Sequence, residues 1–268
     1  PIEATHRMEL IHMGSRGGLL KEKLKAGETV IGPFVIVPSM TMIDTLGYSG
    51  MDFCIIDSEH GPISMETATD MVIAADGTDV APIIRVGDND ERLILRALDI
   101  GSAGVQVPQI NDPDDARKLV NSAKYSPIGE RGLSIFTRAG DYFKDGAPGH
   151  TDRQNDETVV IGHIEGKRGL DNLDEIMEVD GIDVYFLGPY DISQSLGIPG
   201  DVRNPIVEEA LVEACGKARD AGKAVGSYAR DIDMGRWLLS NGVQYLAYNV
   251  DATVYMEACE RIMGELRA

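Results

Sequence analysis

The stretch AGVQVPQINDPDDARKLVNSA (residues 103–123) contains one predicted strand followed by one predicted helix. Residues 103–108 form a short run with the length and the valine content of a buried strand. Asn111 and Asp112 can cap a helix, and Pro113 stands in its first turn, where a missing N–H is tolerated. A strand followed directly by a helix is the repeating unit of parallel α/β folds.

The same alternation recurs along the whole chain. Helix signatures occupy residues 88–101, 204–222 and 251–268, among others. Eight β-rich runs stand at residues 31–37, 52–57, 81–86, 103–108, 159–165, 183–188, 223–229 and 244–250. Eight such units predict a single-domain (β/α)8 TIM barrel. A doubly wound sheet is the alternative, but the G-x-G-x-x-G turn of a nucleotide-binding fold does not follow the first run, and no P-loop occurs.

No linker or low-complexity segment divides the chain. We therefore expect an N-terminal extension at residues 1–16 and the barrel at residues 17–268. One connection, residues 126–158, is long for a barrel loop. It is interpreted as either a lid or an oligomer contact.

The composition argues against several kinds of partner. The 268 residues include 44 acidic and 25 basic side chains, for a formal net charge of -19. That charge repels nucleic acid and anionic membranes, so an anionic substrate would need a metal ion or a placed arginine. The three scattered cysteines are interpreted as reduced thiols. No apolar run approaches the roughly 20 residues of a membrane span. The N-terminus lacks the apolar stretch of a signal peptide. These features predict a cytoplasmic protein.

Two carboxylates fall at the ends of neighbouring strands, where barrel enzymes place their chemistry. Glu165 ends the fifth run, and Asp191 follows the sixth within GPYDIS. Together they suit a hard divalent cation such as Mg²⁺ or Mn²⁺. The spacing alone leaves a helix cap and a solvated carboxylate as alternatives. The turn Gly188-Pro189-Tyr190 offers main-chain N–H groups at a helix start, a seat for a substrate carboxylate.

A second set of polar residues stands at the ends of the second and third runs. Asp57 ends the second run, with Glu59 and His60 just beyond it, and Arg85 lies at the end of the third. Arg85 can direct a positive charge at an oxyanion, and His60, oriented by Asp57 or by Glu59, can act as a general base. Salt bridges at the barrel mouth and polar loop residues are the alternatives. His163 shares the inward face of its strand with Glu165 and is a candidate substrate contact.

The lysines argue against imine chemistry. A Schiff-base aldolase needs a lysine inside the barrel at a strand end. Lys223 begins a strand at the opposite end, and Lys167 alone lies near the mouth, in a turn that we expect to be solvated. We therefore expect no Schiff-base lysine and no nucleotide cofactor.

Several motifs resemble one known family. They are DSEHGP (57–62), APIIRV (81–86), GVQVPQINDPDDAR (104–117), KYSPIGERG (124–132), HIEGKRGLDNLDEI (163–176) and GIDVYFLGPYDISQSLG (181–197). From about residue 17 onward the chain is similar to the HpcH/HpaI family of metal-dependent 2-oxo acid aldolases, which includes 4-hydroxy-2-oxoheptanedioate aldolase and 2-dehydro-3-deoxyglucarate aldolase. The resemblance implies reversible cleavage of a 4-hydroxy-2-oxo acid into pyruvate, or a related 2-oxo acid, and an aldehyde. It also implies a metal-stabilised enolate, a last helix exchanged between subunits and a hexamer built as a trimer of dimers.

The resemblance also implies roles for the residues named above. Glu165 and Asp191 would hold Mg²⁺ or Mn²⁺, with Co²⁺ as a further possibility, and Arg85 would contact the ketone oxygen. His60, paired with Asp57, would be the base through a metal-bound water, and Glu59 would hold waters nearby. Main-chain amides around Tyr190 and Asp191 would receive the pyruvate carboxylate. Where many members have glutamine, this chain has His163.

Two other functions compete with this interpretation. An acyl-CoA lyase of the malyl-CoA type would use a similar metal pair, but it should need a basic groove for the CoA phosphates. A non-catalytic barrel that binds a small acid would have no need for the full polar set. The sequence leaves the identity of the aldehyde open.

Overall fold

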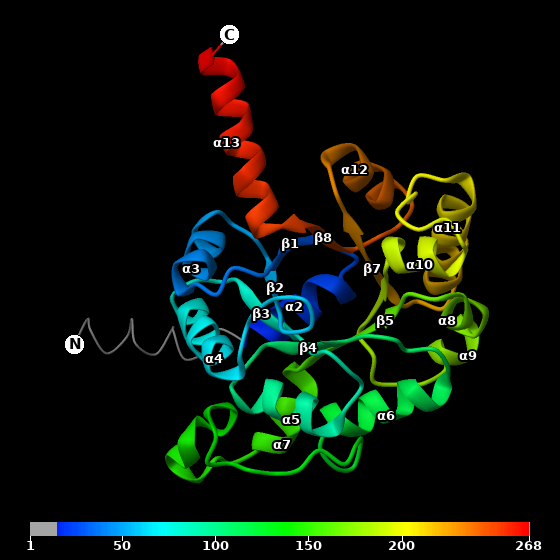
Figure 1. Cartoon of the computed structure of the whole chain (residues 1–268). Coiled ribbons are helices and arrows are strands. Elements are labelled where there is room, and N and C mark those ends of the chain that lie inside the picture. Colours follow the sequence, from blue (N-terminus) through cyan, green and yellow to red (C-terminus); the bar gives the residue numbers. More distant parts are fainter. Residues whose placement is uncertain (1–14, 268) are drawn as a thin grey trace.

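Eight parallel strands close into a barrel in chain order, as Figure 1 shows. The computed structural model describes residues 15–267. The strands are β1 (Val30–Val35), β2 (Phe53–Asp57), β3 (Ala81–Arg85), β4 (Gly104–Val107), β5 (Val159–Ile164), β6 (Val184–Leu187), β7 (Ala224–Ala229) and β8 (Tyr245–Val250). β8 pairs with β1 to complete the closure. The predicted single-domain (β/α)8 barrel is confirmed.

Helices follow the strands and surround the barrel (Figure 1). They are α2 (Arg16–Lys25), α3 (Met40–Tyr48), α4 (Met65–Ala74), η1 (Ala75–Gly77), α5 (Glu91–Asp99), α6 (Pro113–Ala123), η2 (Arg138–Gly146), α7 (His150–Glu157), α8 (Lys167–Asp171), α9 (Leu173–Met177), α10 (Pro189–Ser195), α11 (Pro205–Asp220), α12 (Ile232–Ser240) and α13 (Asp251–Arg267). The expected capping is present at α6, where the Asp112 side chain accepts hydrogen bonds from the main chain of Asp114 and Asp115.

Two apolar layers hold the barrel together. The outer layer lies between the strands and the surrounding helices, and it includes Ile56, Ile84 and Leu119. The inner layer fills the barrel, where Phe53 stacks on Tyr245 with ring centroids 3.8 Å apart. Because both faces of each strand are covered, the strands read as nearly continuous apolar runs in the sequence.

The helix α2 closes the amino-terminal end of the barrel. Its side chains Leu20 and Leu24 belong to the inner apolar layer, together with Val30 at the start of β1 and Val159 at the start of β5. The site must therefore open at the other end. The proposed N-terminal extension, residues 1–16, lies outside the described residues except for Ser15, which caps α2, and Arg16, which begins it.

The long connection of residues 126–158 also lies at the amino-terminal end. It leads from the end of α6 to the start of β5 and contains η2 and α7. Arg138 pairs with Asp76 of η1, which precedes β3, and Arg131 lies 2.6 Å from Asp99, the last residue of α5, which precedes β4. The lid interpretation is therefore wrong for the chain's own barrel mouth, because the segment is anchored at the opposite end. The oligomer-contact interpretation stays a prediction.

The last helix extends away from the barrel, as Figure 1 shows for α13. Only Asp251, its first residue, is buried. Its exposed apolar side chains are Val254, Tyr255, Met256, Ile262, Met263 and Leu266. Within residues 15–267, no helix is both long enough and apolar enough to cross a membrane.

Candidate active site at the carboxyl ends of the strands

A cavity of about 480 Å³ opens at the carboxyl ends of the strands. Most of the residues singled out in the sequence meet in it. Its lining residues are Phe34, Ile36, Asp57, His60, Arg85, His163, Phe186, Gly188, Pro189, Tyr190, Asp191, Tyr228 and Val250. The barrel brings these residues together because parallel strands all end at the same face.

Asp57 and Arg85 form an ion pair at the buried end of this cavity. They are register partners on β2 and β3. Arg85 Nε donates to Asp57 Oδ1 at 2.9 Å, and a terminal guanidinium nitrogen donates to Oδ2. Burial alone would raise the pKa of Asp57, but the bonds and charge of Arg85 and two main-chain N–H groups lower it. The carboxylate therefore stays charged and fixes the guanidinium in one orientation.

The Glu59 side chain touches the same guanidinium. Its Oε2 lies 3.3 Å from Arg85 Nη1, on the side that Asp57 leaves free. Burial raises the pKa of Glu59, although the positive charge of Arg85 opposes that shift. Glu59 thus joins the cluster by a direct contact with Arg85.

His60 lines the cavity from the loop after β2, and its side chain is exposed. The hydrogen bond between this residue and Asp57 runs from the main-chain N–H of His60 to Oδ1, at 3.2 Å. The main-chain N–H of Glu59 donates to the same oxygen at 3.0 Å. Asp57 therefore orients the loop that carries His60, and the hydrogen bonds of its carboxylate do not go to the imidazole.

Glu165 and Asp191 converge across a glycine. A β-carbon built on Gly188 would lie 3.6 Å from Asp191 Oδ2 and 3.6 Å from Glu165 Oε2. The space between the two carboxylates is thus kept free by the missing side chain. Burial and the negative charge of Glu165 together raise the pKa of Asp191, as expected for two acids that face one opening.

This pair fits a hard divalent cation. Carboxylate oxygens are the ligands that such ions prefer, and Mg²⁺ commonly takes one or two carboxylates and fills its other positions with water and substrate. Within residues 15–267, no group of three or more His, Cys, Asp or Glu side chains is arranged as a metal site. Two carboxylates alone would leave most coordination positions of such an ion to water and substrate.

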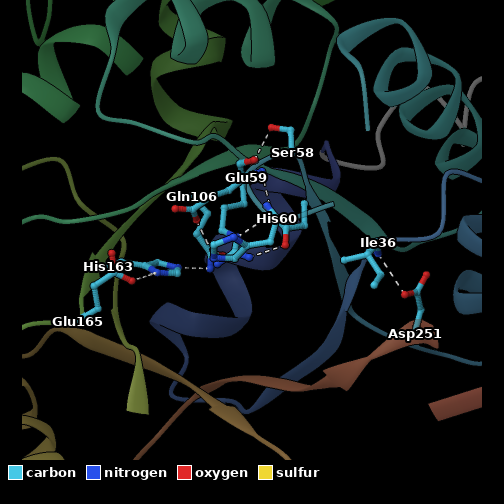
Figure 2. A network of polar contacts seen from close by, with 10 residues as sticks. Ile36, Ser58, Glu59, His60, Gln106, His163, Glu165 and Asp251 are labelled. Atoms are coloured by element: carbon cyan, nitrogen blue, oxygen red, sulfur yellow. Dashed lines mark hydrogen bonds and ion pairs between the residues drawn. The ribbon is translucent and has the colours of Figure 1, made fainter. Parts of the chain in front are cut away.

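His163 connects Glu165 to the barrel interior, as Figure 2 shows. Its Nδ1 lies 3.0 Å from Glu165 Oε2, and its Nε2 contacts the amide nitrogen of Gln106. Since an amide nitrogen can only donate, Nε2 accepts and the ring proton stands on Nδ1, from which it is donated to Glu165. The ring stacks on Phe186 at 4.5 Å between centroids.

The charge state of Glu165 follows from these contacts. Burial alone would raise its pKa, but His163 and the main-chain N–H of Gln109, which donates to Oε1 at 2.8 Å, lower it.

Sequence reasoning missed Gln106. The available signal was a glutamine inside the otherwise apolar run GVQV, where it is fully buried.

The turn Gly188-Pro189-Tyr190 begins α10 beside the carboxylate pair. Pro189 occupies the first helical position, so the next two N–H groups, of Tyr190 and Asp191, lie in the first turn. N–H groups in the first turn of a helix have no partner within the helix. They are available to an anion that enters the cavity.

A barrel that gathers paired carboxylates and an anchored arginine in a cavity at its mouth has the arrangement of an enzyme active site. The comparisons define it further: the chain belongs to the HpcH/HpaI aldolase/citrate lyase family, whose family model matches residues 31–258. The resemblance seen in the sequence and the expected enzyme class, an aldolase, are thereby confirmed.

Individual relatives agree with this assignment. The 2-keto-3-deoxy-L-rhamnonate aldolase of Klebsiella pneumoniae is 35% identical over 92% of both chains. A solved HpcH/HpaI aldolase/citrate lyase family protein from Burkholderia cenocepacia superposes with a TM-score of 0.89 at 29% identity, over 94% of this chain and all of the other. A solved citrate synthase is 30% identical with a TM-score of 0.80, over 92% of this chain and 97% of its own.

Proposed function

We propose that this chain is a divalent-metal-dependent aldolase that reversibly cleaves a 4-hydroxy-2-oxo acid into pyruvate, or a related 2-oxo acid, and an aldehyde. The observation that carries the proposal is the pairing of Glu165 with Asp191 across Gly188, beside a cavity that Asp191 and Arg85 line. The name of the Klebsiella relative describes the cleavage of a 2-keto acid, which agrees with this reaction class.

Glu165 and Asp191 hold the metal in this proposal. Mg²⁺ or Mn²⁺ suits two carboxylate oxygens, and Co²⁺ is a further candidate. When bound, such an ion supplies a Lewis acid for the ketone and carboxylate oxygens of the 2-oxo acid. The hydrogen bonds that Glu165 receives from His163 and Gln109 keep it ionised and fix its orientation.

Arg85 stabilises the negative charge that develops on the ketone oxygen when the carbon–carbon bond breaks. Because Asp57 already orients the guanidinium, little reorganisation accompanies the reaction. Removing one such donor typically costs about 2.7–4 kcal/mol in the barrier. The N–H groups of Tyr190 and Asp191 receive the substrate carboxylate, next to the rigid Gly188-Pro189 turn.

His60 moves the proton. In cleavage it accepts the proton of the 4-hydroxyl group, and in synthesis that of the pyruvate methyl group, in each case through a water molecule. The exposed imidazole has room for that water, and Glu59 beside Arg85 can hold it. Asp57 contributes by fixing the main chain of His60.

The chain acts as a homo-oligomer in the cytoplasm. We expect α13 to be exchanged between subunits in a hexamer of three dimers, which would cover its exposed apolar side chains. The three cysteines are unpaired, and Cys54 and Cys215 are buried, as is usual in a reducing compartment.

Pyruvate release from a 4-hydroxy-2-oxo acid, assayed with and without EDTA, tests the proposal. Glu165→Ala and Arg85→Ala should each lower turnover by at least about 100-fold. The matched control is Lys167→Ala, which removes an exposed lysine that pairs with Asp171 near the mouth. Its activity should match that of the parent chain, since no imine forms. Activity that survives complete metal removal would contradict the proposal.

The same experiment separates the alternatives. Membership of the family sets aside the non-catalytic barrel. An acyl-CoA lyase would cleave malyl-CoA and leave 4-hydroxy-2-oxo acids untouched, so both substrate types belong in the assay.

A further inference from the structure

The polar and apolar linings of the cavity come mostly from different parts of the barrel. The polar side chains lie on or follow β2, β3, β5 and β6, and Phe186 of β6 is the apolar exception among them. The side chains that follow or end β1, β7 and β8 are apolar or aromatic: Phe34, Ile36, Tyr228 and Val250. Together with Tyr190 from α10, these lining residues are called here the aromatic wall. The carboxylates and Arg85 thus share the cavity with a largely apolar surface.

The rings of the aromatic wall pack against one another from the buried end to the mouth. The Arg85 guanidinium lies 4.7 Å from the ring centre of Phe34. Phe34 lies 6.0 Å from Tyr228, and Tyr228 meets Tyr190 edge to face at 5.8 Å. The wall therefore begins beside the oxyanion donor, and the ring of Tyr190, 41% exposed, ends it at the opening.

The charged groups behind the aromatic wall already have partners. The carboxylate of Asp251 accepts the main-chain N–H groups of Ile36 and Val37, each at 3.1 Å, and Figure 2 shows it directed at Ile36. Arg230 Nη1 lies 2.5 Å from Glu257. Among the described residues that line this side of the cavity, none is cationic.

The hydroxyl group of Tyr228, on the aromatic wall, also has a hydrogen-bond partner. The Tyr228 hydroxyl donates to Asn249 Oδ1 at 3.4 Å, and burial raises the pKa of Tyr228 to about 12, so the hydroxyl stays neutral. A carboxylate on the far end of an aldehyde would meet this surface without a counter-charge, and burying an unpaired charge is costly. An aromatic ring would instead gain edge-to-face and stacking contacts.

We propose that the aromatic wall is the aldehyde subsite and that it selects an uncharged aldehyde with an aromatic or other apolar substituent, against carboxylate-bearing semialdehydes. This rests on the proposed aldolase function. In synthesis, the methyl carbon of pyruvate loses a proton and bonds to the carbonyl carbon of the aldehyde, whose oxygen gains a proton. No group is oxidised or reduced, and no further reactant is needed.

A paired aldehyde assay tests this inference. The full-length chain with Mn²⁺ and pyruvate is given benzaldehyde, succinic semialdehyde or glyceraldehyde, and kcat/KM for each aldehyde is measured. Benzaldehyde should exceed succinic semialdehyde by at least about tenfold. A preference for succinic semialdehyde, or for glyceraldehyde, would overturn the inference.

Two substitutions sharpen the assay. Tyr190→Arg places a cation at the exposed end of the wall, and it should raise the succinic semialdehyde to benzaldehyde ratio by about tenfold or more. Tyr142→Leu, on the connection at the opposite end of the barrel, is the matched control and should leave the ratio unchanged. An unchanged ratio in Tyr190→Arg would overturn the assignment of the wall as the subsite.

A separate measurement isolates the proposed function from the subsite. Exchange of the pyruvate methyl protons in D₂O, followed by NMR without any aldehyde, reports the pyruvate half of the reaction alone. Exchange of the methyl protons together with a preference for succinic semialdehyde would overturn only the assignment of the aldehyde subsite. Absence of exchange and of product with every aldehyde would overturn both proposals.

Discussion

His163 donates from Nδ1 to Oε2 of Glu165 across 3.0 Å, and it does so from a buried position. The contact links a candidate metal ligand to Gln106 in the barrel interior. Groups that hydrogen-bond a ligand in this way set its orientation and its charge. His163 is thus best understood as a positioning residue for Glu165 that also lines the cavity.

Replacing His163 tests this role. His163→Leu should weaken Mn²⁺ binding by about 10–100-fold, because Glu165 loses a donor that fixes its orientation and lowers its pKa, although the main-chain N–H of Gln109 remains. His163→Gln keeps an amide donor and should bind within a few-fold of the parent chain. Titration calorimetry of both variants measures the effect. Parent-like affinity in His163→Leu would refute the positioning role.

The ion pair between Asp57 and Arg85 should make stability depend on pH. The folded-state pKa of Asp57 is lowered from 3.8, so its contribution is complete above that value and is lost as pH falls through the folded pKa. Asp57→Asn should lower the free energy of unfolding by about 1.5–3 kcal/mol at pH 7, because Arg85 loses its two charged hydrogen bonds to Asp57 and keeps only the contact with Glu59. Denaturant unfolding of both chains at pH 7 and pH 3 should show the difference shrinking at the lower pH. A difference independent of pH would contradict the ionised pair.

The open space at Gly188 should be essential for metal binding. In Gly188→Ala the new β-carbon would lie 3.0 Å from Glu165 Cβ and in contact with both carboxylates, so Glu165 must shift. We expect Mn²⁺ affinity and turnover each to fall by at least about tenfold while the circular dichroism spectrum is retained. Gly216→Ala is the control, since the nearest atom to its new β-carbon is 3.8 Å away within α11. Undiminished metal binding in Gly188→Ala would be incompatible with the arrangement described.

The exposed apolar side of α13 should be an assembly surface. The double substitution Met256→Lys and Leu266→Lys replaces two exposed apolar side chains with charges, and it should dissociate the oligomer while leaving the barrel folded. Light scattering after size-exclusion chromatography gives the mass. An unchanged mass would count against a role for α13 in assembly.

The barrel and the position of its site could be read from the sequence for a physical reason. Strands covered on both faces appear as short apolar runs, and a closed parallel barrel brings every strand end to one face. Residues as distant as Asp57 and Asp191 could therefore be predicted to meet. The position of residues 126–158 was also implicit, since a connection from a helix end to a strand start lies at the amino-terminal end.

Other features depend on side-chain geometry that a linear pattern does not carry. The resemblance to the family implied that His60 is paired with Asp57. Register places Arg85 opposite Asp57 instead, and the loop turns so that the main chain of His60 makes the contact. Gln106 and Tyr228 look like ordinary strand residues until closure of the barrel directs one at His163 and the other into the cavity.

The proposed function depends on a divalent cation held between Glu165 and Asp191, and a metal titration measures that binding. Calorimetric titration of the metal-free chain with Mn²⁺ should show one ion per chain. Glu165→Gln and Asp191→Asn should each lower the affinity by at least about tenfold, since each removes a charged ligand. Undiminished Mn²⁺ affinity in both variants would show that these carboxylates do not hold the metal.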